Sequence, residues 1–408
     1  MAVELELERG WRLSGDLAAP EVALAAAELE AALGPTGERG FEVALSHGDE
    51  PGESFRRRAR PRRLELHGES PRGLLVGAYA TLEELGARWP WPGAEATTVA
   101  GTRLDAEVEE GPALAGRGLV LGERALVDDV ESWIVWAARR RLNCLFIHVS
   151  TRPAPTGAAP EAAWRERRSR ALALARERGM TVEHGGHLLP ELLPRNAIRA
   201  MGAGRVPGKA ARRAIVEHVR AHPEADVLHL WGADVPPGAR GRESSEAALR
   251  TANAVAEVVE DVHPGAQVAF LAYHDTEEVP RGVRPHHNVC LLFAPRERCY
   301  DHALVDPGCR RNRRYRDLFR AHVEHFGSAG AAPARVLEYW FDAILFADGV
   351  PDLTRTMARD VAFYREAGGH TVGVLITGHG RRPPRHANLP AFARFAWNPR
   401  REPREGGA

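Results

Sequence analysis

The chain has 408 residues, with 55 Lys and Arg against 55 Asp and Glu, and therefore carries no formal net charge. This balance excludes the strongly basic surface that nucleic acids and anionic membranes attract, so we expect neither as a partner. No apolar stretch approaches the roughly 18 residues of a membrane span, and the acidic start MAVELELERG lacks the apolar core of a signal peptide. We expect a cytoplasmic protein of two domains, and leave open whether it forms a homo-oligomer.

The first 100 residues predict a small α+β accessory domain. Its elements, in chain order, are a strand at 3–13, a helix at 20–33, strands at 41–46 and 63–67, and a helix from about Arg72. The stretch between the second and third of these strands is polar and interrupted by Gly and Pro, which is typical of a loop. Residues 101–115 are expected to be a linker or a β-extension into the next domain.

From residue 116 to the end, eight short apolar runs alternate with amphipathic helical stretches. The runs lie at 118–123, 144–150, 180–187, 226–234, 267–274, 288–295, 335–342 and 370–378. Such alternation predicts an α/β fold, a (β/α)₈ TIM barrel over 116–408 that forms the candidate catalytic domain. The loop 236–243 is long enough for an active-site lid, and Ser244 or Ser245 is expected to cap the helix that ends near His263.

Polar residues gather at the ends of these runs, where TIM barrels carry their chemistry. They are Glu123, His148, Glu183, His184, His187, Asp234, Tyr273, His274, Asp275, Glu338 and Asp342. Because the fourth and seventh strands face each other across the mouth of a barrel, Asp234 and Glu338 form a natural carboxylate pair.

Two carboxyl groups are what glycoside hydrolysis requires, one as general acid and one as nucleophile or base. We assign these roles to Asp234 and Glu338 respectively. Two alternatives stay open: Asp234 can cap a turn, and Glu338 can form a salt bridge with an Arg. Asp342 replaces Glu338 if the seventh strand ends later than expected, because both residues have the same parity along a regular strand.

The remaining strand-end groups suit the binding of a sugar. Histidines and carboxylates can hydrogen-bond its hydroxyls, and aromatic rings can pack on its apolar face. The expected substrate-binding residues are His184, His187, Trp231, Tyr273, His274, Asp275, Tyr300, His302 and Asp342. The alternative is zinc or manganese held by the histidines. Because the first strand lacks a His-x-His pair, we expect no metal and no cofactor.

Four cysteines are too few for a disulfide scaffold in a chain of this length, so we expect reduced thiols. Cys299 and Cys309, separated by nine residues, are close enough for a disulfide or a shared metal, but a reducing cytoplasm favours neither. Four arginines surround them, and a solvated charged loop is the expected state of these side chains: Arg296, Arg298, Arg310 and Arg311.

Several segments resemble known families. Residues 70–93 resemble the end of the accessory module that precedes the catalytic barrel in bacterial α-glucuronidases and β-N-acetylhexosaminidases. The rest is similar to a family of bacterial glycoside-hydrolase-like barrels designated a domain of unknown function. The matching pieces are 139–143, 185–187, 271–273, 298–300, His302, Asp306, Cys309, Asn312, 338–340, Asp342, Asn388 and 397–399, of which Cys299-Tyr300-x-His302 is the most specific.

The resemblance implies a glycosidase that acts on a small glycoside or oligosaccharide, with a uronic acid or an amino sugar as the implied unit. Hexosaminidases carry an Asp-Glu pair after the fourth strand, whereas here Val235 follows Asp234. That departure leaves their mechanism unsupported for this chain. Two other classes stay open: a metal-dependent hydrolase or isomerase that uses the histidines, and a barrel that binds carbohydrate without catalysis.

Overall fold

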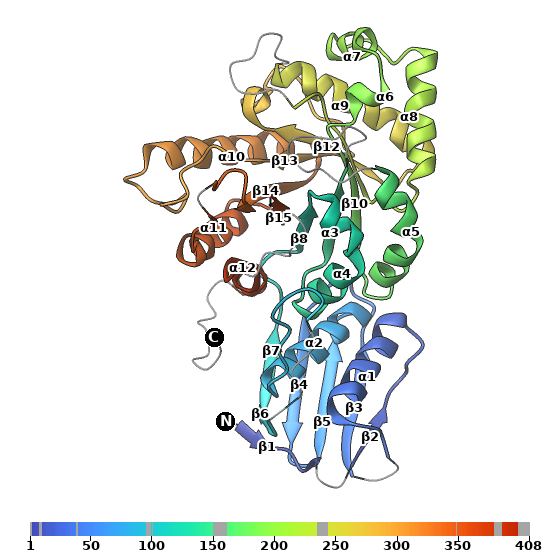
Figure 1. The fold of residues 1–408 in the computed structure, drawn as a ribbon, viewed down its shortest axis with the longest axis vertical. Helices are drawn as coiled ribbons and strands as arrows, with labels where there is room; N and C mark the ends of the chain where they lie inside the picture. The colour runs from blue at the N-terminus through green and yellow to red at the C-terminus, as the bar shows by residue number, and fades with distance from the viewer. Residues whose placement is uncertain are drawn as a thin grey trace. The chain divides into compact units, whose positions relative to one another are not determined.

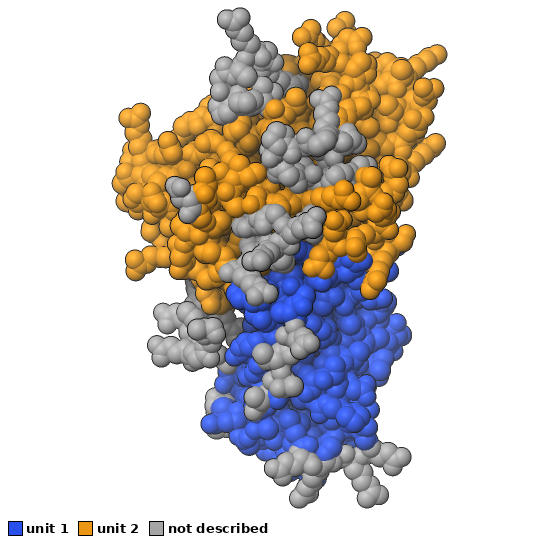
Figure 2. All heavy atoms as spheres, viewed as in Figure 1, with its two compact units in different colours: residues 1–113, 131–143, 173–180 blue, residues 114–130, 144–172, 181–408 orange. Residues whose placement is uncertain are grey.

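The computed structural model describes residues 2–7, 10–37, 40–94, 99, 101–149, 161–234, 244–347, 349–378 and 386–398. The expected lid at 236–243 and Pro399 lie outside the described residues. The chain divides into two compact units, one of residues 1–113, 131–143 and 173–180 and the other of 114–130, 144–172 and 181–408 (Figure 2). None of the described helices combines the length and the apolarity that crossing a membrane needs.

The first unit is built on a five-stranded sheet in the order β2-β3-β5-β4-β7. These strands are β2 (Trp11–Ser14), β3 (Phe41–His47), β5 (Arg63–Gly68), β4 (Phe55–Arg60) and β7 (Glu107–Glu110). Two helices accompany the sheet, α1 (Pro20–Leu33) and α2 (Pro71–Glu84), and a separate antiparallel pair joins β1 (Ala2–Glu4) to β6 (Arg103–Asp105). Both helices begin with Pro, and the Ser70 hydroxyl caps α2 by accepting the Gly73 N–H at 3.1 Å.

This unit holds more strands than the sequence predicts. The expected strand at 3–13 is two strands, β1 and β2, and the polar stretch expected to be a loop contains β4. In β4 the buried positions are Phe55, Arg57 and Ala59, and the Arg57 guanidinium pairs with Glu84 at 2.9 Å. Because an arginine occupies a core position, the alternation of apolar and polar residues that marks a strand is hidden.

The second unit is a closed barrel of eight parallel strands, as the sequence predicts (Figure 1). The strands are β8 (Gly116–Leu121), β9 (Cys144–His148), β10 (Thr181–Gly186), β11 (Val227–Leu230), β12 (Gln267–Ala272), β13 (Val289–Phe293), β14 (Ala332–Asp342) and β15 (Thr371–Thr377). The TIM-barrel fold class is confirmed.

Helices follow the strands in the pattern of a (β/α)₈ barrel. They are α3 (Arg124–Asp128), α4 (Val130–Arg139), α5 (Glu161–Arg176), α6 (Leu189–Leu192), α7 (Arg195–Gly202), α8 (Lys209–Ala221), α9 (Ser245–Val262), η2 (His274–Thr276), α10 (Arg310–Ser328), α11 (Thr354–Glu366) and α12 (Asn388–Trp397). Residues 131–143 and 173–180, which include most of α4 and the end of α5, group with the first unit. The expected cap of α9 is Ser244, whose hydroxyl accepts the Ala247 N–H at 3.2 Å.

A charged group lies in the middle of the barrel interior. The Glu183 carboxylate contacts the Arg335 guanidinium at 2.5 Å and His229 Nε2 at 2.8 Å, and Phe146 stacks on His229 with ring centroids 3.9 Å apart. Burial opposes ionisation of Glu183, but Arg335 and His229 outweigh it and hold its pKa below the usual value. Glu183 is therefore part of the barrel core, because β10 continues for three residues beyond it.

Three histidines make the second unit sensitive to acid: His222 and His322, which are buried, and His148, which is half-buried. Burial lowers the pKa of His148 to about 3, of His222 to about 2 and of His322 to about 4. Below pH 6.5 the unfolded chain binds protons at these side chains and the folded chain does not. Their contribution to the free energy of unfolding is therefore complete above pH 6.5 and decreases as the pH is lowered. We expect a loss of about 1.4 kcal/mol per pH unit for each histidine, measured by urea unfolding between pH 7 and pH 5.

The variant His322→Gln should reduce this pH slope, whereas His287→Gln, which changes an exposed histidine, should leave it as in the parent. An unfolding free energy that stays constant from pH 7 to pH 5 would show that the buried histidines are protonated in the folded state.

Candidate active site at the barrel mouth

A β-bulge in β14 decides which carboxylate reaches the mouth of the barrel. Opposite β15, Glu338 pairs with Val374 but Phe341 pairs with Ile376, so three residues of β14 span two of β15. Before the bulge Arg335 points into the barrel and Glu338 therefore points outward. The extra residue reverses the alternation, so Asp342 takes the opposite face to Glu338.

Asp342 is the last residue of β14, and its carboxylate is tightly held. Its Oδ2 accepts a hydrogen bond from Arg296 Nε at 3.1 Å, while its Oδ1 accepts the backbone N–H groups of Ile344 and Leu345 at 2.9 and 3.0 Å. These three donors fix its orientation at the end of the seventh strand. The seventh strand thus ends later than the assignment of Glu338 as a catalytic carboxylate requires. For that case the sequence predicts that Asp342 takes the place of Glu338.

Aromatic rings join the ends of β12 and β14. Tyr273, which follows β12, lies parallel to Tyr339 of β14 with ring centroids 6.5 Å apart, and it stacks on His274 at 3.6 Å. The Arg296 guanidinium lies 6.0 Å from the centre of the Tyr339 ring and contacts Glu297 at 2.9 Å. The ends of the fifth, sixth and seventh strands therefore meet at one place.

Tyr273 also connects this group to Asp234. Burial raises the pKa of Tyr273, and the negative charge of Asp234 raises it further, with smaller contributions of the same sign from Glu297 and Asp342; Arg296 acts in the opposite direction. Both Asp234, after the fourth strand, and Asp342, at the end of the seventh, are therefore within electrostatic reach of one phenol.

The fourth strand brings Asp234 close to His187. Asp234 is exposed, three residues beyond Trp231, and the His187 ring lies edge-on to Trp231 at 5.2 Å. His187 Nδ1 is 2.7 Å from the Gly232 carbonyl oxygen. Burial lowers the pKa of His187, while the charges of Asp234 and Asp275 oppose that shift.

Trp231 is buried behind His187. Its ring contacts Phe146 and His148 with centroids 5.8 and 5.9 Å away. Among the residues that the structure describes, its indole Nε1 has no hydrogen-bond partner. Trp231 thus packs beneath the mouth of the barrel, and its indole N–H is the polar edge of the ring.

Glu338 is not part of this group, which corrects the predicted catalytic pair. Its Oε1 lies 3.1 Å from Arg298 Nε and accepts the Tyr364 hydroxyl at 2.5 Å, and Arg298 Nη2 also contacts Asp360 at 2.7 Å. Glu338, Arg298 and Asp360 have no exposed side-chain surface, and Asp360 and Tyr364 belong to α11. Glu338 thus forms a salt bridge with an arginine, the alternative that the sequence left open for it.

Three expected binding residues also lie elsewhere. His184 is fully buried and stacks on His222 at 3.9 Å; it faces the helices because its neighbour Glu183 faces the barrel interior. Tyr300 is buried, with the Arg298 guanidinium 4.3 Å from its ring centre. His302 is exposed and its Nδ1 lies 3.3 Å from Cys299 Sγ, so it belongs to a cysteine cluster in the sixth loop.

The mouth histidines do not gather into a metal site in the described part of the chain. Three groups there bring their ligand atoms within 4.8 Å of one another, and neither His187 nor His274 belongs to any of them: His184 with His218 and His222, Cys299 with His302 and Cys309, and Glu260 with His286 and His287.

Sequence reasoning missed the roles of Arg296, Glu297 and Tyr339. Arg296 and Arg298 were expected in a solvated loop, yet Arg298 is fully buried and Arg296 binds Asp342. Two signals could have indicated this: Arg296 comes three residues after the sixth strand, and Tyr339 has the same parity as the inward-facing Arg335.

Comparison with known proteins supports the fold. Residues 237–402 match the model of a domain of unknown function, DUF4838. All of these residues belong to the second unit, which contains the barrel. The expected resemblance to a family designated a domain of unknown function is confirmed over these residues, and no curated protein matches the chain.

Solved structures of glycoside hydrolases share the fold at low sequence identity. A GH138 enzyme targeting pectin rhamnogalacturonan II is 14% identical with a TM-score of 0.61, over 96% of this chain and 51% of that enzyme. The N-acetyl-β-hexosaminidase of Streptomyces plicatus is 16% identical (TM-score 0.62, 97% and 87%), and the β-N-acetylhexosaminidase of Bacteroides fragilis 15% (0.60, 97% and 88%). The chain spans about half of the GH138 enzyme, and the likeness establishes a glycoside-hydrolase-like fold.

Because Glu338 compensates a buried cation, its replacement should damage stability. We expect Glu338→Gln to lower the unfolding free energy by about 3 kcal/mol, since it leaves Arg298 with a single carboxylate. Tyr364→Phe, which removes one donor to the same carboxylate, should cost about 1 kcal/mol. Urea unfolding monitored by circular dichroism measures both changes.

Glu297→Gln is the matched control, because it changes a half-exposed glutamate and should cost less than about 1 kcal/mol. If Glu338→Gln retains the parent stability, Glu338 is not the structural counter-ion described above.

Proposed function

We propose that the chain is a glycoside hydrolase that cleaves a small glycoside or oligosaccharide with Asp234 and Asp342. The observation that supports this most is the place of Asp342, whose carboxylate is held by Arg296 at 3.1 Å at the end of the seventh strand. Asp234 follows the fourth strand; the fourth and seventh strands face each other across a TIM barrel, and the fold is that of glycoside hydrolases. The cytoplasmic location, the oligomeric state and the lack of nucleic-acid and membrane partners stay predictions.

The surroundings of the two carboxylates suggest different roles. Asp342 is held by a guanidinium and two backbone N–H groups, which suits a carboxylate that attacks the anomeric carbon or accepts a proton from water. Asp234 is exposed beside His187, where it can donate a proton to the leaving oxygen. Val235 stands where hexosaminidases have Glu, so we propose catalysis by the protein's own carboxylates rather than the hexosaminidase mechanism.

The rest of the mouth provides groups for binding a sugar. Tyr273 is partly exposed and offers its ring to the apolar face of a pyranose, with the buried ring of Tyr339 parallel to it, and Arg296 offers a cation for an acidic substituent. His187 and His274 can exchange hydrogen bonds with hydroxyls. The GH138 enzyme targets a pectin, so we include uronic acids among the proposed substrates, beside the amino sugars of the hexosaminidases.

Activity against a panel of 4-nitrophenyl glycosides, with uronides and N-acetylhexosaminides among them, tests the proposal. On any substrate that the parent cleaves, Asp342→Asn and Asp234→Asn should each lower kcat by about 10²- to 10⁴-fold, because each removes a group that acts in the transition state. Asp261→Asn on α9, an exposed aspartate paired with Arg212, should leave kcat unchanged.

Two other results would contradict the proposal and select the other classes. Turnover that survives in both variants but stops with a chelator would indicate a metal-dependent enzyme. Binding of a glycan without turnover of any substrate in the panel would indicate a barrel that binds carbohydrate only.

A further inference from the structure

A compact set of soft metal ligands lies in the loop between β13 and α10. Cys299, His302 and Cys309 bring their sulfur and imidazole nitrogen atoms within 4.8 Å of one another, and Cys299 Sγ is 3.3 Å from His302 Nδ1. Both cysteines are free thiols. In a tetrahedral zinc site, bond lengths of about 2.3 Å to sulfur and about 2.0 Å to nitrogen place neighbouring ligand atoms about 3.5 Å apart. The separation of Cys299 and His302 is close to that value.

The backbone around these ligands is held in place by a buried amide. Asn312, in the first turn of α10, is fully buried. Its Oδ1 accepts the Cys299 N–H at 2.8 Å, and its Nδ2 donates to the carbonyl oxygens of Cys299 and His302 at 2.9 and 2.7 Å. Cys309 is the residue directly before α10. One side chain thus fixes two of the three ligand positions, and the start of the helix fixes the third.

The loop is also anchored directly before Cys299 and again between His302 and Cys309. Arg298, directly before Cys299, forms the buried ion pairs with Glu338 and Asp360, and the Leu304 N–H donates to Asp360 at 2.6 Å. Cys299 and His302 therefore lie between two anchored residues, and Cys309 directly precedes α10. Such preorganisation favours metal binding, because little chain entropy is lost when the ion arrives.

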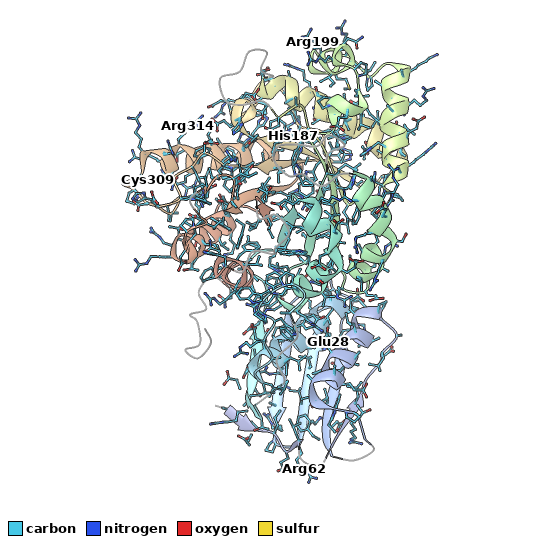
Figure 3. The ribbon with its side chains drawn as sticks, in the orientation of Figure 1. Glu28, Arg62, His187, Arg199, Cys309 and Arg314 are labelled. Atoms are coloured by element: carbon cyan, nitrogen blue, oxygen red, sulfur yellow. The ribbon has the colours of Figure 1, made fainter. Side chains whose placement is uncertain are left out.

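The cluster is distinct from the mouth of the barrel. Figure 3 shows Cys309 at the outer end of α10, well away from His187. Cys299 and Cys309 are partly exposed and His302 is exposed, so an ion can reach them from solvent.

The histidine group of His184, His218 and His222 is less suited to a cation. The rings of His184 and His222 are stacked face to face at 3.9 Å, and the positive charges of Arg168 and Arg165 act on His222. Two thiols and one imidazole, by contrast, are a preferred donor set for zinc.

We propose that Cys299, His302 and Cys309 bind one zinc ion that ties the loop after the sixth strand to the start of α10. Binding converts both thiols to thiolates and releases two protons, and water completes the tetrahedron. Three protein ligands and one water make an open zinc site. Because it lies away from the mouth of the barrel, we assign the ion the role of tying the loop to α10. The inference does not depend on the reaction at the mouth.

Metal analysis of the full-length protein tests this proposal without an activity assay. The reduced protein is incubated with zinc chloride, desalted and analysed by mass spectrometry for elements. We expect about one zinc per chain for the parent and for His287→Gln, and at least a tenfold lower content for His302→Gln and Cys309→Ser. Cobalt chloride should give a sulfur-to-cobalt charge-transfer band in the parent that His302→Gln weakens and Cys309→Ser removes.

The thermal midpoint gives a second readout. Zinc should raise the Tm of the parent and leave that of His302→Gln unchanged; His302 is exposed, so this variant should fold. Equal zinc content in the parent and in His302→Gln would overturn the proposal. So would a Cys299–Cys309 disulfide in the purified protein, shown by the loss of two titratable thiols and no binding of zinc after reduction.

Discussion

The buried Arg298 guanidinium is the interaction on which the rest of the candidate site depends. A cation without contact with water is stable only when carboxylates compensate it, and here Glu338 of β14 and Asp360 of α11 do so. The same contacts attach the loop after β13 to its neighbours and occupy Glu338 on the helix side of the barrel. What reaches the mouth from the seventh strand is therefore Asp342, with Arg296 beside it.

The bulge in β14 allows one strand to place Glu338 on the helix side of the barrel and Asp342 at its mouth. Without the extra residue, Glu338 and Asp342 would face the same side, and one strand could not supply both a counter-ion for Arg298 and a carboxylate for the mouth. Its position next to the site agrees with the general use of bulges to redirect a side chain near catalytic groups. The loop after β13 contacts both carboxylates: Arg296 donates a hydrogen bond to Asp342, and Arg298 donates one to Glu338.

The eight barrel strands could be predicted because each is a short buried run with helical periodicity on either side, and the bounds 20–33 of α1 agree with its structure. The choice between Asp342 and Glu338 could not, because alternation shows parity but not where a strand gains a residue. His184 and Glu183 illustrate the same limit: both lie near the end of one run, yet one faces a helix and the other the barrel interior. The β4 strand was missed because Arg57 occupies a core position that only its partner Glu84 explains.

A crystal structure of the protein with an iminosugar matched to the substrate that it cleaves tests the role of Asp342 most directly, since the charged ring nitrogen mimics the transition state. We expect this nitrogen within hydrogen-bonding distance of Asp342, with Asp234 near the leaving-group side and Glu338 still in contact with Arg298. An iminosugar bound against Glu338, or bound away from Asp342 and Asp234, would contradict this assignment.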